Sequence, residues 1–223
     1  MPHFVTSLVI ISVEKCGAAR YNEHRIQWEG LMSQIKMVAE NLTPAEVKLR
    51  DGFRIIDSSS KLFTKREFAK QWAAACEQLV RGYDEKLYES MMLSDEKIPA
   101  DGIHFVMASF GRLISTATVQ MTDDPEEAYL HMVGTRRNAR NLGAGHAVCA
   151  SCVNYAIAHG IRRMRLFTDE FRLPAIRIYY GLGFRPDFYE TGMRERWNGV
   201  MKTLGVSEYE AVNENGKKET VKL

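Results

Sequence analysis

The sequence predicts an α/β fold, and three observations predict it. Runs rich in β-forming residues cover 103–109, 113–121 and 127–135, with turn residues between them. A loop with two glycines then leads into an apolar helical pattern at 144–159. A strand at 164–168 is followed by a second helical pattern from Pro174 to about Leu182.

The first hundred residues predict further elements. The apolar run Phe4 to Val13 is interrupted by polar residues and is too short to span a bilayer, so we expect a leading strand rather than a signal peptide. Apolar residues at 28, 31, 35, 38 and 42 have helical spacing and predict a helix over about 19–41. Capping boxes at Thr43–Glu46 and Thr64–Glu67 predict two helix starts, the second helix reaching about residue 82, with a short strand at 53–56 between them.

The C-terminal part is divided by glycine and proline. Gly160 ends the helix at 144–159, and Gly183, with Pro186 shortly beyond, ends the helix that starts at Pro174. We expect one more helix near 193–204 and a hairpin around Asn215-Gly216. The predicted organisation is an N-terminal strand and helix extension at 1–50, a main domain at 51–205, and a C-terminal tail with a hairpin at 206–223.

Composition and charge exclude several classes of protein. The 223 residues are 45% apolar and 26% charged with a net charge of +2, which is typical of a globular protein and gives no field that would attract nucleic acid or membrane. The 4 cysteines are few and scattered, which favours a reducing, cytoplasmic location. Cys149 and Cys152 form C-x-x-C, but no second pair or histidine cluster completes a metal site, so we expect no metal and assign both to the core.

The segment from Arg140 to Gly145 carries the first sign of chemistry. A strand that enters a glycine loop and then a helix points several backbone N–H groups at one anion, and Gly143 and Gly145 allow a diphosphate to approach closely. A Walker-type loop is excluded because His146 follows Gly145 where lysine is required. A dinucleotide fingerprint fails because Val148 stands at its third glycine position and too little chain follows Asp169.

Three consecutive segments resemble motifs of the GNAT superfamily of acetyltransferases: Leu130 to Thr135, Arg140 to Gly145, and Ala175 to Phe184, the last matching A-x-x-x-Y-x-x-x-G-F. The resemblance covers about residues 53–204. The histidine in the strand, Arg172-Leu173-Pro174 and Glu195-Arg196-Trp197 are similar to a bacterial subgroup that includes relatives of mycothiol synthase.

The resemblance implies a GNAT-like acyl-CoA N-acyltransferase fold, a mixed α+β sheet whose central strands, 128–135 and 164–168, are splayed. Acetyl-CoA would lie in the opening. Its pantetheine arm would pair with the backbone from Val133 through Gly134 to Thr135. Its pyrophosphate would meet Arg140 and the amides of a short run: Asn141, Leu142, Gly143, Ala144 and Gly145. Arg172 stands where the family commonly has an asparagine in the CoA site.

The family's catalytic roles map onto this chain unevenly. The resemblance implies that the Val133 amide polarises the thioester carbonyl and that Tyr179 protonates the thiolate of CoA. A carboxylate base is often found four residues before the polarising amide, but Tyr129 stands there. This leaves His131, or Glu127 acting through water, as the general base; Glu127, Tyr129, His131 and Val133 share one face by strand alternation.

The predicted activity is therefore transfer of an acetyl group from acetyl-CoA to a primary amine of a small molecule. Two alternatives stay open: a protein lysine or N-terminal acetyltransferase, and an acyl-CoA-binding regulatory module without catalysis. The N-terminal elements and the C-terminal hairpin are natural pairing elements for a homodimer. The acceptor is left open, because acceptor pockets of the family are built from its variable segments.

Overall fold

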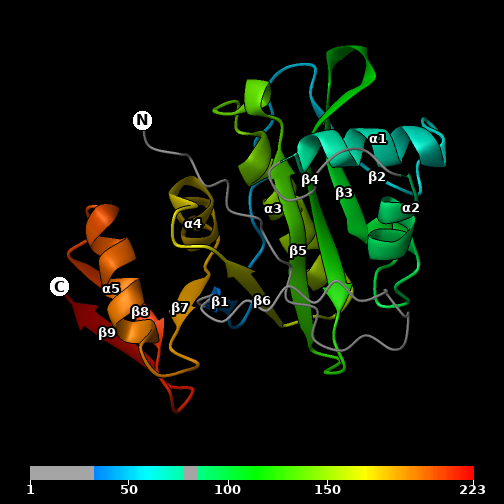
Figure 1. Cartoon of the computed structure of the whole chain (residues 1–223). Coiled ribbons are helices and arrows are strands. Elements are labelled where there is room, and N and C mark those ends of the chain that lie inside the picture. The colour runs from blue at the N-terminus through cyan, green and yellow to red at the C-terminus, as the bar shows by residue number, and fades with distance from the viewer. Residues whose placement is uncertain (1–32, 78–84) are drawn as a thin grey trace, which may run out of the picture. The chain divides into compact units, whose positions relative to one another are not determined.

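The computed structural model describes residues 33–77 and 85–223, and residues 34–223 form one compact unit. The predicted strand at 4–13 and the predicted helix up to residue 32 lie outside the described residues. The unit is built on a 9-stranded sheet with the order β2-β3-β4-β5-β6-β1-β7-β8-β9 (Figure 1). None of the helices in the described part of the chain is long and apolar enough to cross a membrane.

The strands are β1 Ile35–Ala39, β2 Arg54–Asp57, β3 Ile103–Ala108, β4 Arg112–Met121, β5 Glu127–Thr135, β6 Arg163–Thr168, β7 Arg185–Asp187, β8 Glu208–Val212 and β9 Lys218–Lys222. The α-helices are α1 Lys65–Ala75, α2 Glu85–Tyr88, α3 Ala144–Ala158, α4 Leu173–Gly181 and α5 Met193–Thr203. Short 3-10 turns at Ala100–Gly102, Ser109–Gly111 and Arg137–Ala139, and a π turn at Glu89–Leu93, connect them.

Most local predictions are confirmed. Thr64 caps α1, its hydroxyl accepting from the Glu67 amide while the Glu67 carboxylate accepts from the Thr64 amide, the reciprocal arrangement of a capping box. α1 ends at Ala75. The hairpin of β3 and β4, the helices after Gly143 and Arg172, and the β8–β9 hairpin around Asn215-Gly216 lie where the sequence predicts them.

The predicted helix over 19–41 is wrong at its C-terminal end, where β1 lies. Ile35 and Met37 are completely buried in the middle of the sheet, and β1 pairs antiparallel with both β6 and β7. Apolar residues three and four apart fit a helix locally, but β1 has strand neighbours on both sides that satisfy its backbone. Lys36 is tied to β7 by an ion pair to Asp187 at 2.7 Å.

The helix predicted to start at Thr43 is also wrong: residues 42–50 are extended and are called the strap below. The Ala45 N–H donates to Asn154 Oδ1 and the Ala45 carbonyl accepts from Asn154 Nδ2, both at 2.8 Å. Because a side chain of α3 takes both backbone groups, the strap needs no helical hydrogen bonds at this point.

α1 and α3 cover opposite faces of the sheet. Phe105 on β3 meets Phe68 of α1 with ring centroids 5.3 Å apart, whereas the adjacent Val106 belongs to the core cluster that contains α3. Neighbouring residues of a strand point to opposite faces, so one helix lies on each side. Figure 1 shows α1 in front of the sheet and α3 behind it.

β5 and β6 pair over only part of their length. They are parallel, and the pairing runs from Glu127↔Arg163 to Tyr129↔Arg165, after which β5 continues to Thr135 without β6 beside it. The two strands are therefore splayed at their C-terminal ends, as the sequence predicts.

Candidate active site

Among residues 33–77 and 85–223, no strand pairs with β5 beyond Tyr129 on the side of the opening between β5 and β6. The Arg136 N–H donates to the Ile114 carbonyl at 2.9 Å, so the backbone N–H of this residue points toward β4. Successive residues of a strand point their N–H and C=O groups to alternate sides, and this turns those of Thr135 and Val133 toward the opening. These are the two residues expected to pair with a pantetheine arm.

A β-bulge at Met132 bends β5 just before this edge. Met132 has a φ of 48°, and the register with β4 shifts between Thr116 and Thr118. The extra residue shifts the pairing with β4, but from Glu127 to Val133 the side chains still alternate between half-buried and buried, as predicted. The burial pattern therefore agrees with the expectation that Glu127, Tyr129, His131 and Val133 share one face.

The glycine loop ends in the uncapped N-terminus of α3. Gly143, at a φ of 79°, is the N-cap and offers no side chain, so the N-cap residue itself cannot accept a hydrogen bond from the first amides of α3. A Cβ at Gly145 would stand 3.3 Å from both Thr135 Oγ1 and Ile178 Cδ1, so the missing side chain lets α3 approach the end of β5 and α4 closely. Unsatisfied amides beside the opening suit an anion such as a diphosphate.

Tyr179 lies in the core beside the opening. Its side chain is 6% exposed. Burial is the main cause that raises the pKa of Tyr179 far above its usual value; Cys149 and Tyr129 raise it further, and Arg172 opposes the shift. The phenol therefore keeps its proton over the physiological range. The adjacent Tyr180 faces away toward β8, where its hydroxyl accepts from the Glu210 amide at 3.4 Å.

His131 is held in its neutral form. Burial lowers its pKa to about 4, and the nearby Asp95 carboxylate only partly offsets this effect. The imidazole lies 5.2 Å from the Tyr129 ring, centroid to centroid. The sequence alone predicts a histidine with an ordinary pKa near 6.5, and the buried environment makes His131 a weaker base than that.

Glu127 lies at the closed end of the β5–β6 pair. Its carboxylate is 3.6 Å from Arg165 Nη1, and six residues of strand, roughly 20 Å, separate it from Val133. Tyr129 lies at the last paired position, where burial raises its pKa and the charge of Arg165 and a hydrogen bond from the Phe167 backbone lower it. The structure thus brings Tyr129 and Tyr179 to the opening and leaves Glu127 away from it.

Arg140 and Arg172 flank the site in different ways. Arg140 is exposed on the loop, whereas Arg172 Nε donates to Asp169 Oδ2 at 2.7 Å just before α4. Sequence reasoning did not identify the strap as a neighbour of the glycine loop: Arg50 donates to the Asn141 carbonyl at 3.4 Å, and the Lys48 backbone carbonyl lies beside Gly143. The alternation of apolar and charged residues at 45–50 was the signal for an extended segment there.

Residues 66–184 match the sequence model of the Acetyltransferase (GNAT) family. Comparison with curated proteins found no match.

Solved structures give the same fold. A GCN5-related N-acetyltransferase from Sphaerobacter thermophilus is 17% identical with a TM-score of 0.56, covering 70% of this chain and 49% of its own. One from Kribbella flavida is 19% identical with a TM-score of 0.50, covering 70% of this chain and 55% of its own. The glucosamine N-acetyltransferase region of a fungal multi-domain β-N-acetylglucosaminidase is 12% identical with a TM-score of 0.50, covering 69% of this chain and 19% of its own. This chain spans about half the length of the first two.

Proposed function

Because the match covers more than half of its length, this chain belongs to the GNAT acetyltransferase family, and we propose that it transfers an acetyl group from acetyl-CoA directly to a primary amine of a small molecule. The observation that carries the proposal is the opening between β5 and β6, bordered by the free backbone edge at Val133 and Thr135 and by the protonated phenol of Tyr179. Acetyl-CoA supplies the activated thioester.

The residues present fit such a cofactor at both ends of the site. The uncapped amides at the start of α3 and the exposed Arg140 suit a diphosphate, and the strand edge of β5 suits the amides of a pantetheine arm. The amide of Val133, which points into the opening, is the proposed donor to the thioester oxygen. One preorganised donor of this kind contributes about 2.7–4 kcal/mol to lowering a barrier.

The proposed reaction requires two proton transfers, one to the thiolate of CoA and one from the amine. Tyr179 is the proposed acid, since its buried phenol stays protonated until a stronger base forms next to it. For the amine, His131 is the proposed acceptor of its proton, because it is neutral and lies two residues before Val133 on β5. Glu127 is the less suitable base, because its carboxylate is engaged by Arg165 at the closed end of the strands.

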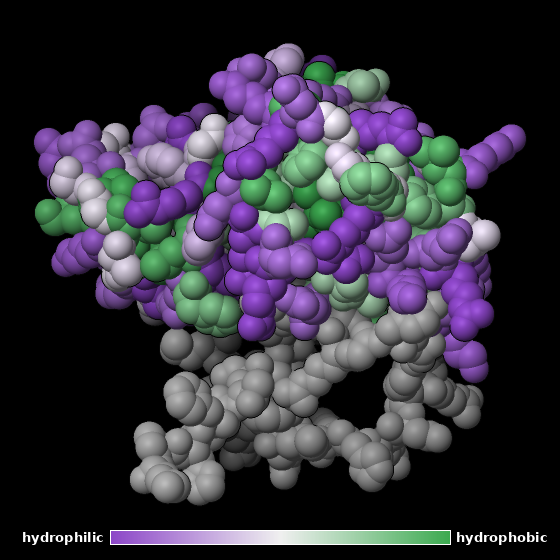
Figure 2. All heavy atoms as spheres, turned by 90° about the horizontal axis from the view of Figure 1, so that it is seen from above, coloured by the Kyte–Doolittle hydropathy of each residue, from purple (hydrophilic) through white to green (hydrophobic). Residues whose placement is uncertain are grey.

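A small acceptor is favoured over a basic protein tail by charge. The chain carries a net charge of only +2, and Asp169, the acidic residue that directly follows β6, is paired with Arg172. The face in Figure 2 is mainly hydrophilic with smaller hydrophobic areas. Buried cysteines at 76, 149 and 152 suit the reducing cytoplasm.

The test is a panel of amines with acetyl-CoA, in which release of free thiol is followed. The panel includes amino acids, aliphatic diamines, glucosamine and peptides with a free N-terminus or a lysine. Thiol release that depends on a small amine supports the proposal. Turnover with peptides alone would make the chain a protein acetyltransferase, and tight acetyl-CoA binding with no turnover on any amine would leave a binding module.

A further inference from the structure

Four aromatic rings, those of His131, Tyr129, Phe167 and Tyr189, lie in a line beside the opening and are called the aromatic row below. His131 and Tyr129, both on β5, have ring centroids 5.2 Å apart. Tyr129 meets Phe167 of β6 at 6.1 Å, and Phe167 meets Tyr189, which follows β7, at 5.9 Å; both contacts are edge to face. Aromatic pairs prefer such separations and angles, so the rings form one packed surface.

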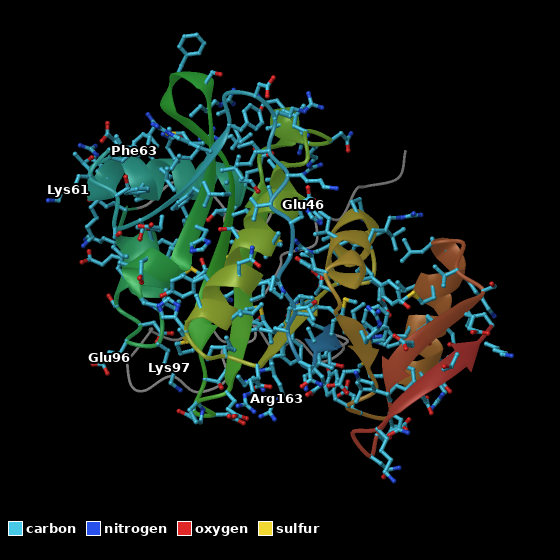
Figure 3. The ribbon with its side chains drawn as sticks, turned by 180° about the vertical axis from the view of Figure 1, so that it is seen from behind. Glu46, Lys61, Phe63, Glu96, Lys97 and Arg163 are labelled. Atoms are coloured by element: carbon cyan, nitrogen blue, oxygen red, sulfur yellow. The ribbon has the colours of Figure 1, made fainter. Side chains whose placement is uncertain are left out.

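The aromatic row crosses from β5 to β6 at the point where the two strands separate. Tyr129 lies opposite Arg165 at the last paired position, and Phe167 is the next residue of β6 on the same face, beyond the pairing. Seen from behind, Arg163 lies at the other, closed end of this pair (Figure 3). The contact between Tyr129 and Phe167 therefore forms the base of the opening on this face.

The two ends of the aromatic row differ in their surroundings. His131 lies two residues before Val133, whose amide is the proposed donor to the thioester oxygen. Tyr189, at the other end, is 36% exposed, whereas Phe167 in the middle is half-buried. The row thus starts next to the proposed place of the thioester and leads outward to the surface.

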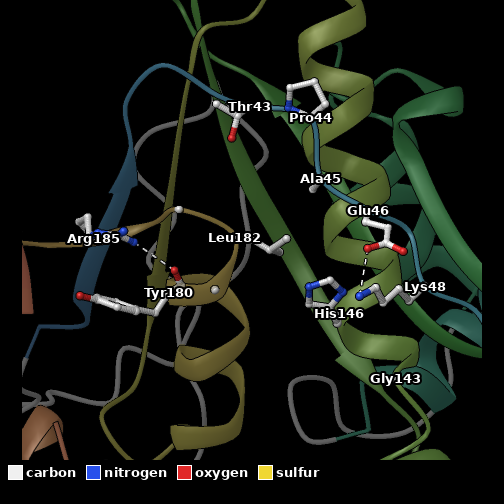
Figure 4. Close-up of a pocket in the computed structure, with 12 residues that line it drawn as sticks. Thr43, Pro44, Ala45, Glu46, Lys48, Gly143, His146, Tyr180, Leu182 and Arg185 are labelled. Atoms are coloured by element: carbon white, nitrogen blue, oxygen red, sulfur yellow. Dashed lines mark hydrogen bonds and ion pairs between the residues drawn. The ribbon is translucent and has the colours of Figure 1, made fainter.

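The opposite face of β5 and β6 leaves no path for an acceptor. Its side chains are buried in the core together with α3: Ala128, Leu130, Met164 and Leu166. The cavity of about 600 Å³ shown in Figure 4 is also bounded by α3, between the strap and the end of α4, and it shares Gly143 with the proposed diphosphate loop. An amine therefore reaches the thioester across the face that carries the aromatic row.

The polar groups next to the outer end of the aromatic row already have partners. Lys36, which lies opposite Phe167 in the register, pairs with Asp187 at 2.7 Å, and its ammonium is 5.8 Å from the centre of the Tyr189 ring. The Tyr189 hydroxyl donates to the Gln34 carbonyl at 2.6 Å. A ligand along these rings meets apolar surface and satisfied polar groups, which suits an uncharged aromatic group.

We propose that the acceptor is an arylalkylamine, with its ring along the aromatic row and its amino group next to His131. The inference rests on the proposed function and names the class of amine. In the transfer, the amine nitrogen bonds to the acetyl carbon and the C–S bond breaks. The amine gives its proton to His131, and the thiolate takes one from Tyr179. Phe167 and Tyr189 select the acceptor and move no proton.

The experiment compares the acetylation of phenethylamine, cyclohexylethylamine and ethylamine by the full chain, followed by thiol release. The first two carry a six-membered ring on the same short chain and differ in aromaticity. We expect kcat/KM for phenethylamine to exceed that for ethylamine by about 100-fold, because the ring is buried. It should exceed that for cyclohexylethylamine by about fivefold, because only an aromatic ring makes edge-to-face contacts.

Variants of the aromatic row test which residues cause the preference for phenethylamine over cyclohexylethylamine. Phe167→Leu keeps an apolar side chain but removes the central ring, so the preference should fall to about twofold or less. Tyr189→Leu should lower it in the same direction, whereas Tyr189→Phe keeps the ring and the preference. Phe110→Leu, the matched control, removes a fully exposed ring at the β3–β4 turn and keeps the wild-type preference. Each preference is a ratio within one protein, so a general loss of activity cancels.

Equal turnover of the three amines by the wild type would overturn the aryl acceptor and leave small-amine acetylation in place. The same holds if Phe167→Leu and Tyr189→Leu keep the wild-type preference, or if another small amine such as glucosamine is acetylated and none of these three is. If the folded wild type binds acetyl-CoA but releases thiol with no small amine at all, the proposed function fails, and this inference with it.

Discussion

Gly134 of β5 lies directly against the end of α1, so close that a Cβ at Gly134 would stand 2.6 Å from the carbonyl oxygen of Ala75. On the other side of this contact, the Cys76 thiol is 3.9 Å from the Met132 carbonyl. α1 is thus packed on the bulged part of β5, next to the residues that border the opening. The glycine that the sequence motif contains at 134 serves this helix contact as well as any cofactor.

Gly134→Ala is therefore expected to push α1 away from β5. No flexible side chain can move aside, because the clashing atoms are backbone, and overpacking of this kind costs about 1–3 kcal/mol of unfolding free energy. Urea denaturation of the wild type and the variant measures the change. Gly199→Ala in α5 is the matched control: a Cβ there meets nothing within 4 Å, so this change is expected to be stabilising by about 0.5–1 kcal/mol. Equal stability of Gly134→Ala and the wild type would contradict the contact.

Tyr179→Phe is expected to lower kcat by about 100-fold and to leave the KM for acetyl-CoA nearly unchanged. The change removes only the hydroxyl, and general acid groups typically contribute factors of this size. Tyr180→Phe is the control next to it, since that hydroxyl contacts the Glu210 amide on β8 and not the opening. Steady-state kinetics by thiol release measures both. The assignment of the acid is wrong if the two variants lose activity equally.

The sequence predicted the part of the fold in which local signals and tertiary structure agree. Three such signals are the capping box at Thr64, the helix end at Gly160 and the turn at Asn215-Gly216. Each satisfies backbone groups within a few residues, so these structures form independently of residues far away in the sequence. The splay of β5 from β6 was implied by motifs at three separate places, and the pairing of the two strands confirms it.

The wrong predictions concern segments whose structure depends on residues far away in the sequence. Ile35 and Val38 have helical spacing, yet β1 is a strand because β6 and β7 pair with it from residues more than 120 positions later. Ala45 follows a helix-start signal but is held extended by Asn154. The bulge at Met132 and the low pKa of His131 also depend on neighbouring strands and burial, which a single strand pattern does not contain.

Arg140→Glu is expected to weaken acetyl-CoA binding by about tenfold or more, because it replaces a cation beside the proposed diphosphate site with a repelling charge. Binding measured at two salt concentrations separates this effect from misfolding, since the loss should shrink as salt screens the charges. Arg137→Glu is the matched control. Arg137 lies three residues earlier and is also exposed, but it already pairs with Glu77. If both variants bind alike, the loop does not use Arg140 for the phosphates.

His131 gives a prediction for stability as a function of pH. Its folded pKa, about 4, lies below the unfolded value of 6.5, so between these pH values the unfolded chain binds more protons than the folded one. The folded state therefore loses stability as the pH falls from about 6.5 toward 4, by up to about 3 kcal/mol from this group. His131→Gln should lose less stability over the same range. His104, whose pKa is also lowered by burial, contributes equally to both proteins.

Urea denaturation at pH 7.5 and pH 5 of the wild type and His131→Gln checks this, and identical losses in the two proteins would show that His131 is not desolvated. The same shift bears on catalysis. His131 is already neutral at pH 6.5, so its protonation should not contribute an inflection near pH 6.5 to the pH profile of kcat/KM. The wild type and His131→Gln should therefore have the same profile in this range. An inflection of that kind would mean that the free enzyme exposes this imidazole to water, and His131 would then be the ordinary base that its residue type suggests.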